Sequence, residues 1–152
     1  MNFTRSAKAQ WKGNGKNGKG TMSTESTVLQ DAQYSYNTRF EDGKGTNPEE
    51  LIGAAHAGCF SMQLSFLLGE AGFTPTTLDV DAKVDFKDGE IVKVTLDLKG
   101  NVRFSGLFIF GLKGNVPNIK ADEFNKIAQK AKEVCPVSKL LKAEIVLIAS
   151  LS

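Results

Sequence analysis

The sequence predicts an α+β domain. Three observations indicate it: an uncharged helix in the middle of the chain, strand patterns on both sides of that helix, and an amphipathic helix near the end. Alternating polar and apolar residues predict strands over 7–12, 20–28, 33–40, 77–86, 90–102 and 143–150. Lys87-Asp88-Gly89 is a strong hairpin signal between two of these strands. Residues 121–134 carry apolar side chains on one side and are predicted to form the second helix.

Composition bounds the possible functions. The chain has 152 residues, 41% of them apolar, so we expect one domain over 1–152 with a substantial core. The net charge of +2, with both signs mixed along the chain, gives no case for binding nucleic acid or membranes. The first residues lack the apolar stretch of a signal peptide, so a cytoplasmic, reducing setting is expected. Two cysteines in that setting are expected to be catalytic, redox-active or merely buried.

The predicted central helix covers residues 46–72. Thr46 or Asn47 can cap its start, and Pro48 suits the first helical position. Gly72 is a plausible stop. Residues 51–68 carry no charge, so the helix should be buried in a core. Its polar residues and limited apolar length argue against a membrane span.

A ridge of small residues runs along this helix at positions that share one stripe. Its members are Ala54, Gly58, Ser61 and Ser65. Small side chains allow another backbone to approach closely. Two interpretations remain open: contact with a sheet of the same chain, or contact with a second copy of the helix across a two-fold axis.

Cys59 lies near the middle of the predicted helix. Burial there raises the pKa of a thiol above its free value of about 8.5 and makes it unreactive. A reactive Cys59 therefore needs a nearby cation, and the helix carries none. Arg39, expected at the end of the preceding strand, is the best-placed candidate. Glu49 or Glu50 would hold its guanidinium group in place.

The spacing between Glu49 and Cys59 constrains this site. The intervening ten residues correspond to about 15 Å of a continuous helix, so the two side chains do not meet within one straight helix. They could meet if the helix is broken. Alternatively, two antiparallel copies crossing near Ala54 would bring each Glu49 beside the other chain's Cys59. A site shared between two chains is therefore one hypothesis.

Cys135 follows the second predicted helix and precedes Pro136. Proline disfavours helical geometry at the residue before it, so the chain should bend at Cys135. Pro136 can then begin a short helix over 136–142, and a thiolate is favoured at such a start. Cys135 could attack an oxidised Cys59, in a cycle of sulfenic acid, disulfide and reduction by an outside dithiol. From the spacing alone, two inert thiols remain the default interpretation.

Two further stretches draw attention. GNGKNGKG at 13–20 nearly matches a phosphate-binding loop, but no helix pattern follows it, so a solvated hairpin turn is predicted instead of a nucleotide site. KGNV occurs at 99–102 and again at 113–116, which indicates an insertion over 99–116. The segment 104–112 between the repeats is too apolar for a free loop and is expected to cover a pocket, a partner or the core.

TNPEELIGAAHAGCFSMQLS, followed much later by VCPVSKLLKAEI, resembles the OsmC/Ohr family of osmotically inducible and organic hydroperoxide resistance proteins. NTRFEDGKGTNPEELIGAAHAGCFSM, LLGEAGFTPTTLDV and GKGTMSTES make the resemblance closest to the OsmC branch, over nearly the whole chain. It implies an OsmC-like fold, with antiparallel sheets wrapped around long buried central helices in an intertwined homodimer. It also implies a thiol peroxidase that reduces hydroperoxides, with organic ones preferred in the Ohr branch.

The resemblance also implies roles for four residues. Cys59 matches the peroxidatic cysteine and Cys135 the resolving cysteine, while Glu49 matches the glutamate of the NPE motif and Arg39 the OsmC-type arginine. No cofactor is implied beyond an external dithiol reductant, and lipoylated proteins are reductants within the family. The segment 99–116 departs from the family pattern.

Two alternatives stay open beside the peroxidase. A redox-sensing or ligand-binding dimer of the same fold would oxidise once without turnover and would use the apolar segment 104–112 for a ligand or a partner. A Cys–His acyl hydrolase would use His56, three residues before Cys59. Two cysteines and one histidine make a poor zinc site because a fourth ligand is missing.

Overall fold

A computed structural model of the chain describes residues 2–104 and 119–151. The chain divides into two compact units, Met1–Leu51 and Ile52–Ser152, which are treated separately below. Helix α2, Pro48–Glu70, begins in the first unit and continues into the second. The predicted insertion over 99–116 and the apolar segment 104–112 fall mostly on residues 105–118, which lie outside the described residues.

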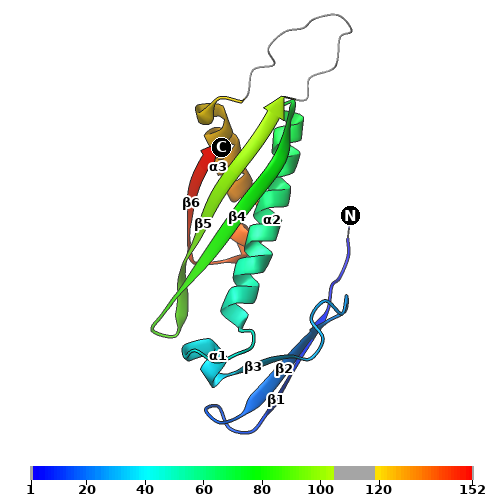
Figure 1. The fold of residues 1–152 in the computed structure, drawn as a ribbon, viewed down its shortest axis with the longest axis vertical. Helices are drawn as coiled ribbons and strands as arrows, with labels where there is room; N and C mark the ends of the chain where they lie inside the picture. The colour runs from blue at the N-terminus through cyan, green and yellow to red at the C-terminus, as the bar shows by residue number, and fades with distance from the viewer. Residues whose placement is uncertain (1, 105–118, 152) are drawn as a thin grey trace, which may run out of the picture. The chain divides into compact units, whose positions relative to one another are not determined.

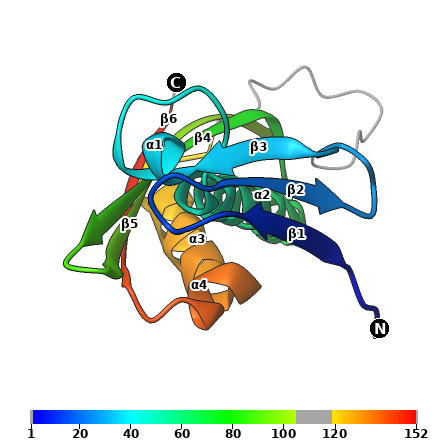
Figure 2. The same ribbon diagram turned by 90° about the horizontal axis from the view of Figure 1, so that it is seen from below.

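The first unit is built on a three-stranded antiparallel sheet (Figures 1 and 2). Its strands, in order, are β1 (Ala7–Lys12), β2 (Lys19–Thr24) and β3 (Ala32–Ser35). The stretch 13–20 turns the chain from β1 into β2, as predicted, and no helix follows it. The second and third strands are shorter than predicted, since the chain turns after Thr24 and enters a helix after Ser35.

The end of the third predicted strand is a short helix, so the placement of Arg39 at a strand end was wrong. Arg39 lies in the last turn of α1, Tyr36–Phe40. The cause is a capping box: Ser35 Oγ accepts a hydrogen bond from the Thr38 amide, and Thr38 Oγ1 accepts one from the Ser35 amide. These bonds satisfy backbone donors that a helix start leaves unpaired, and they end β3.

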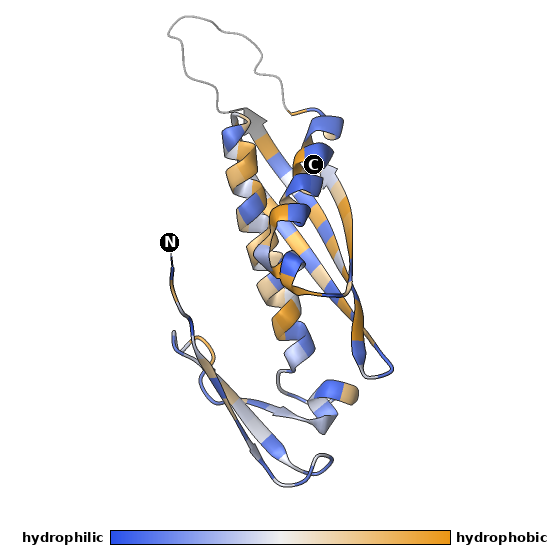
Figure 3. Ribbon diagram, turned by 180° about the vertical axis from the view of Figure 1, so that it is seen from behind, coloured by the Kyte–Doolittle hydropathy of each residue, from blue (hydrophilic) through white to orange (hydrophobic). Residues whose placement is uncertain are grey.

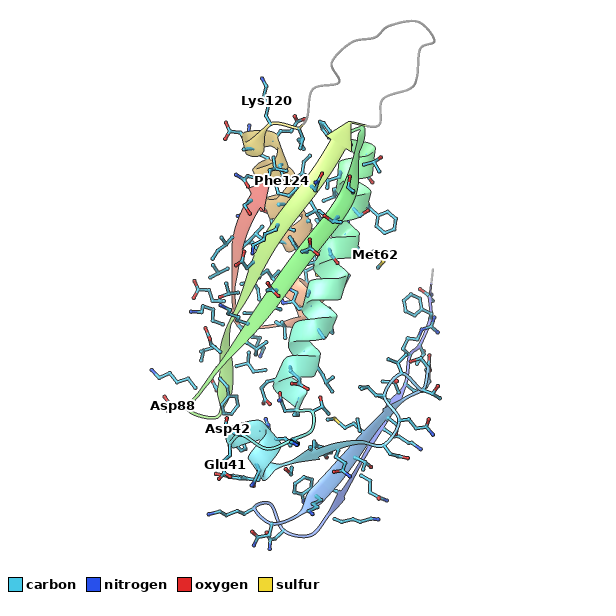
Figure 4. The ribbon with its side chains drawn as sticks, viewed as in Figure 1. Glu41, Asp42, Met62, Asp88, Lys120 and Phe124 are labelled. Carbon is cyan, nitrogen blue, oxygen red and sulfur yellow. The ribbon has the colours of Figure 1, made fainter. Side chains whose placement is uncertain are left out.

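The second unit contains a sheet of three strands in the order β4, β5, β6. β4 (Phe73–Lys87) and β5 (Glu90–Phe104) form an antiparallel hairpin, with Asp88 and Gly89 at positive φ in its two-residue turn (Figure 4). β6 (Glu144–Leu151) pairs with β5 in parallel. The predicted α+β class is confirmed, but this sheet is mixed and not purely antiparallel.

The parallel pairing follows from the connection between β5 and β6. Parallel neighbours need a crossover long enough to return the chain to the same end of the sheet. The described part of that connection, from residue 119 onward, contains two helices, α3 (Ala121–Val134) and α4 (Pro136–Leu140). The bounds of α3 match the prediction, and Cys135 sits at the bend between the two helices.

Helices α2 and α3 cover the same face of this sheet (Figure 3). Along β5 the buried side chains alternate with less buried ones, as a sheet with one covered face requires. Phe124 of α3 is fully buried, and Gly100 of β5 gives its ring room: a Cβ at this glycine would lie 2.5 Å from the ring. The α2 residues buried in this core are Gly53, His56, Phe60, Leu64 and Leu68.

The opposite face of α2 is exposed in the single chain. Met62 and Phe66 are 61% and 62% exposed, and Met62 points away from the sheet (Figure 4). The expectation that α2 is buried all round is therefore wrong for one chain, because its own sheet covers only one stripe. Ala54, Gly58 and Ser65 of the small-residue ridge are also exposed, so contact with the chain's own sheet does not explain the ridge.

Helix α2 also meets the length and hydropathy criteria for a membrane span. Its buried stripe packs against a sheet, however, and the core helix of a soluble protein has the same composition.

Candidate active site

Two cysteines that lie 76 residues apart in the sequence meet in the second unit. The Sγ atoms of Cys59 and Cys135 are 2.9 Å apart, and both residues are free thiols. Cys59 lies on α2 and is partly exposed, whereas Cys135 is fully buried in the core. The structure therefore places an accessible sulfur directly beside a protected one.

The position of Cys135 follows from its local sequence. Its amide donates a hydrogen bond to the carbonyl of Ala131, which completes the last turn of α3. Pro136 begins α4, and Cys135 accordingly has φ −59° and ψ 122°, outside the helical region. Its carbonyl then accepts a hydrogen bond from Lys139, so Cys135 ends one helix and precedes the next.

The thiols respond differently to their surroundings. Burial raises the pKa of Cys59, and its hydrogen bond with Cys135 raises it further, while the Val137 amide acts in the opposite direction. Burial also raises the pKa of Cys135. For Cys135, however, interactions with the Cys59 thiol, with the amide and hydroxyl of Ser138 and with the Val137 amide together outweigh that effect, so its pKa is lowered. Neither amide makes a regular capping hydrogen bond to the sulfur.

The pair can be described as two sulfurs that share one proton. Within the second unit, hydrogen bonds favour the negative charge on Cys135 and the proton on Cys59. Cys59 is accordingly not a ready nucleophile on the strength of these contacts alone. This agrees with the expectation from sequence that a reactive Cys59 needs a cation from elsewhere.

His56 and Ser138 form a second pair beside the thiols. His56 Nε2 lies 2.7 Å from Ser138 Oγ, and His56 is fully buried. Burial lowers the pKa of His56, so the ring is neutral at pH 7. The sequence spacing placed His56 near Cys59 but did not indicate a hydrogen-bond partner for its ring. Ser138 was missed, although its position three residues after Cys135 would have signalled proximity to that thiol.

In the first unit, Arg39 and Glu49 form a close ion pair. Arg39 Nη2 donates to Glu49 Oε1 at 2.6 Å, and Arg39 Nε donates to the two carboxylate oxygens at 3.0 and 3.2 Å. The guanidinium also lies over the ring of Phe40. Of the two predicted partners, Glu49 is the one that holds Arg39, because Glu50 hydrogen-bonds with Thr46 and Asn47 at the start of α2.

Each member of this ion pair stabilises the charged form of the other. The hydrogen bond from Arg39 lowers the pKa of Glu49, and the hydrogen bond to Glu49 raises the pKa of Arg39. Because the folded-state pKa of Glu49 is lowered, its contribution to stability is fully present above the ordinary glutamate pKa. That contribution is lost as the pH falls through the lowered value. The pair is therefore intact at neutral pH.

The four predicted site residues thus fall into two pairs. The thiol pair belongs to the second unit and the ion pair to the first. Among the described residues, no group of three or more histidine, cysteine, aspartate or glutamate side chains is arranged to hold a metal ion.

The first unit also contains a pocket of about 510 Å³ beside the glycine-rich turn. Its lining includes Lys12, Lys16, Lys19 and Lys44. A strand, β2, and not a helix, follows the turn, so the arrangement that holds phosphate in a phosphate-binding loop is absent from this described stretch.

Comparison with known proteins identifies the family. The family model described as OsmC-like protein matches residues 41–150, so the chain belongs to the OsmC-like family. It is 52% identical to the peroxiredoxin OsmC of Escherichia coli (strain K12) over 149 residues, which is 97% of this chain and 96% of that relative. It is also 24% identical over 140 residues to organic hydroperoxide resistance protein-like 2 of Staphylococcus epidermidis, covering 86% of this chain and 84% of that one.

Solved structures support the fold. An OsmC-like protein from Vibrio cholerae superposes with a TM-score of 0.69 at 16% identity, covering 97% of this chain and 99% of that one. The organic hydroperoxide resistance protein OhrB of Bacillus subtilis gives a TM-score of 0.65 at 22% identity, covering 97% and 98%. At these identities the likeness concerns the fold alone, and it confirms the predicted OsmC-like fold.

Proposed function

We propose that this protein is a cysteine-based peroxidase that reduces hydroperoxides, organic ones in particular, to alcohols. The observation that carries the proposal is the 2.9 Å separation of the Cys59 and Cys135 sulfurs. Two thiols at that distance can be oxidised together to a disulfide, which gives the chain a two-electron reducing capacity. The 52% identity with a peroxiredoxin over nearly the full length of both chains supports the same conclusion.

The first step is attack by the Cys59 thiolate on the outer oxygen of the hydroperoxide. An S–O bond forms and the O–O bond breaks, so the sulfur is oxidised by two electrons to a sulfenic acid. The departing alkoxide takes up a proton and leaves as the alcohol. Cys59 is the thiol that is partly exposed, which favours it over the buried Cys135 as the site of attack.

The second step is attack by Cys135 on the Cys59 sulfenic acid. The S–S bond forms as the S–O bond breaks, and the leaving hydroxide takes up a proton from solvent and departs as water. An external dithiol then reduces the disulfide and restores both thiols. A small dithiol or a lipoylated protein suits this role, and the cycle needs no other cofactor, because sulfur itself carries the electrons.

Arg39 supplies the cation that Cys59 lacks. A guanidinium beside Cys59 would lower the pKa of that thiol and would stabilise the alkoxide that develops as the O–O bond breaks. Glu49 holds the guanidinium in one orientation through three hydrogen bonds. The same interaction keeps both groups charged at neutral pH.

We infer that the working form is a homodimer in which a second copy covers the exposed face of α2. That face carries the small-residue ridge together with the exposed apolar side chains of Met62 and Phe66, and exposed apolar side chains gathered on one face mark an interaction surface. Helix α2 is continuous from Pro48 to Glu70, which supports the alternative in which Glu49 and Cys59 of one site come from different chains. In this proposal the ion pair of each chain serves Cys59 of the partner subunit. We further infer a soluble, cytoplasmic protein.

Turnover distinguishes this function from a redox sensor of the same fold. The protein is mixed with several equivalents of an alkyl hydroperoxide in the presence of a dithiol, and peroxide loss is followed. A peroxidase consumes every equivalent, and a sensor consumes a single equivalent per chain before it stops. Repeating the measurement with hydrogen peroxide tests the preference for organic substrates. An acyl hydrolase would consume no peroxide by this route and would cleave thioesters instead.

The role of Arg39 is tested with Arg39→Ala. We expect oxidation of Cys59 at pH 7 to slow by about 10²–10³-fold, the cost of removing one strong donor at a developing oxyanion. Arg5→Ala is the matched control, because Arg5 also pairs with a glutamate in the first unit and is exposed. Rapid mixing with one equivalent of hydroperoxide, followed by quenching and mass spectrometry, gives the rate. An unchanged rate in Arg39→Ala removes the arginine from the mechanism.

Mixed dimers then decide whether the site is shared. Arg39→Ala chains are combined with Cys59→Ser chains and allowed to exchange. If the ion pair acts across the dimer, each mixed dimer regains one complete site, and activity rises well above that of either parent. If the ion pair serves its own chain, both sites of the mixed dimer stay defective and no activity returns.

A further inference from the structure

His56 is a fully buried polar residue to which the peroxidase mechanism gives no role. Its ring is fully buried, its Nε2 lies 2.7 Å from Ser138 Oγ, and its Nδ1 has no hydrogen-bond partner. Burying such a group costs free energy unless its hydrogen bonds are made, so its presence beside a reactive thiol pair calls for an explanation.

The orphan nitrogen indicates which tautomer is present. If Nδ1 carried the proton, a buried N–H would have no acceptor, which is rarely tolerated in folded proteins. If Nε2 carries the proton, Nδ1 is left as a bare acceptor, and Nε2–H donates to Ser138 Oγ. The second arrangement leaves no donor unpaired. In this arrangement Ser138 Oγ accepts a hydrogen bond from His56, so the hydroxyl hydrogen of Ser138 points away from the ring.

Cys135 is the acceptor available to that O–H. Ser138 is the third residue of α4 and Cys135 immediately precedes the helix, so the two residues lie about one helical turn apart. The Ser138 hydroxyl is among the groups that hydrogen-bond the Cys135 sulfur and lower its pKa. A chain of hydrogen bonds therefore runs from His56 through Ser138 to Cys135, and Cys135 in turn contacts Cys59.

We propose that His56 and Ser138 are positioning residues for disulfide formation, in which His56 orients the Ser138 hydroxyl to hold Cys135 as a thiolate aimed at Cys59. This proposal rests on the proposed function. Neither residue touches the peroxide. Their effect is confined to the second step, in which the Cys135 sulfur forms the S–S bond, the Cys59 S–O bond breaks, and the leaving hydroxide takes up a proton from solvent and departs as water.

The neutral state of His56 suits this role. Burial lowers the pKa of His56, so the ring stays neutral at neutral pH. His56 therefore acts as a fixed hydrogen-bond donor and does not exchange protons with the thiol. A hydrogen bond to an ionised sulfur is stronger than one to a neutral thiol, so the bond favours the thiolate. Hydrogen bonds of this class change a rate by about 10–100-fold when they are removed.

Four variants test the proposal. Ser138→Ala removes the hydroxyl, and Ser138→Thr retains it. His56→Gln places an amide N–H near the position of Nε2, whereas His56→Asn places its amide near Nδ1. After mixing with one equivalent of alkyl hydroperoxide, acid quenching and mass spectrometry give separate rates for Cys59 oxidation and for disulfide formation.

We expect Ser138→Ala and His56→Asn to slow disulfide formation by about 10–100-fold while Cys59 oxidation changes by less than about twofold. Ser138→Thr and His56→Gln should recover most of the rate. A merely structural role would slow both steps together and would not separate Gln from Asn. Equal slowing of both steps, or no slowing in Ser138→Ala, overturns the proposal. The serine variants provide the test even if the histidine variants fail to fold.

A second measurement tests this proposal independently of peroxidase activity. In a Cys59→Ser background, the ultraviolet absorbance of the Cys135 thiolate is compared with and without Ser138→Ala. Loss of thiolate absorbance in the double variant supports the proposal, and unchanged absorbance contradicts it. If the unaltered protein forms no disulfide with peroxide, the proposed function fails on its own, and the absorbance still decides whether Ser138 stabilises the thiolate.

Discussion

Replacing Cys59 with serine is expected to reduce peroxide turnover at least about 1,000-fold, because the only partly exposed thiol of the described pair is lost. A serine hydroxyl is not ionised at neutral pH, and it cannot accept an oxygen atom as sulfur does. Steady-state consumption of an alkyl hydroperoxide with a dithiol gives the measurement.

The matched control for this variant is Lys130→Ala. Lys130 lies on α3, away from the exposed face of α2, and its side chain is 61% exposed. It should leave turnover within about twofold of the original. If Cys59→Ser keeps its fold and still consumes peroxide at a rate close to the original, Cys59 is not the nucleophile.

Replacing Cys135 with serine is expected to abolish turnover in a different manner. Cys59 should still be oxidised once, since its sulfur and its proposed cation are unchanged. The sulfenic acid then has no thiol beside it, so each chain should consume one equivalent of peroxide rapidly and then lose catalytic turnover. Further peroxide should drive Cys59 to the sulfinic acid, which a dithiol does not reverse.

The initial oxidation serves as the internal control for Cys135→Ser. A burst of one equivalent shows that the buried substitution has not unfolded the site. Mass spectrometry of the intact chain then reads the oxygen atoms added to Cys59. Continued turnover by this variant would mean that an external thiol, and not Cys135, normally attacks the sulfenic acid.

Sequence patterns located most of the elements around the thiols. The limits of α3 followed from its apolar stripe, and the bend at Cys135 followed from Pro136. The hairpin turn at Asp88 and Gly89 followed from the need for positive φ at both positions. These features are set by neighbouring residues, and a local pattern is sufficient to predict them.

Features set by distant contacts could not be predicted in the same way. The contact between His56 and Ser138 joins residues that lie 82 positions apart, and only the tertiary fold brings them together. The parallel pairing of β6 with β5 likewise depends on how the chain returns after α4. Arg39 was placed on a strand because the alternation of 33–40 outweighed a local signal, the capping box of Ser35 and Thr38.

The two faces of α2 could not be distinguished from the sequence. Between Leu51 and Leu68 no residue is charged, so the pattern does not separate the face buried by the chain's own sheet from the face that the single chain leaves exposed. In the structure, Gly53 faces β4 and Gly58 meets nothing within 4 Å. The small-residue ridge can be recognised in the sequence, but its exposure in the single chain is known only from the structure.

The most direct test is a peptide map of the protein after one equivalent of alkyl hydroperoxide per chain, taken without reduction. If the sulfurs at 2.9 Å form the working pair, each chain loses two hydrogen atoms and yields one linked peptide joining residues 59 and 135. A chain that instead gains oxygen at Cys59, with residue 135 recovered as a free thiol, would contradict the central claim.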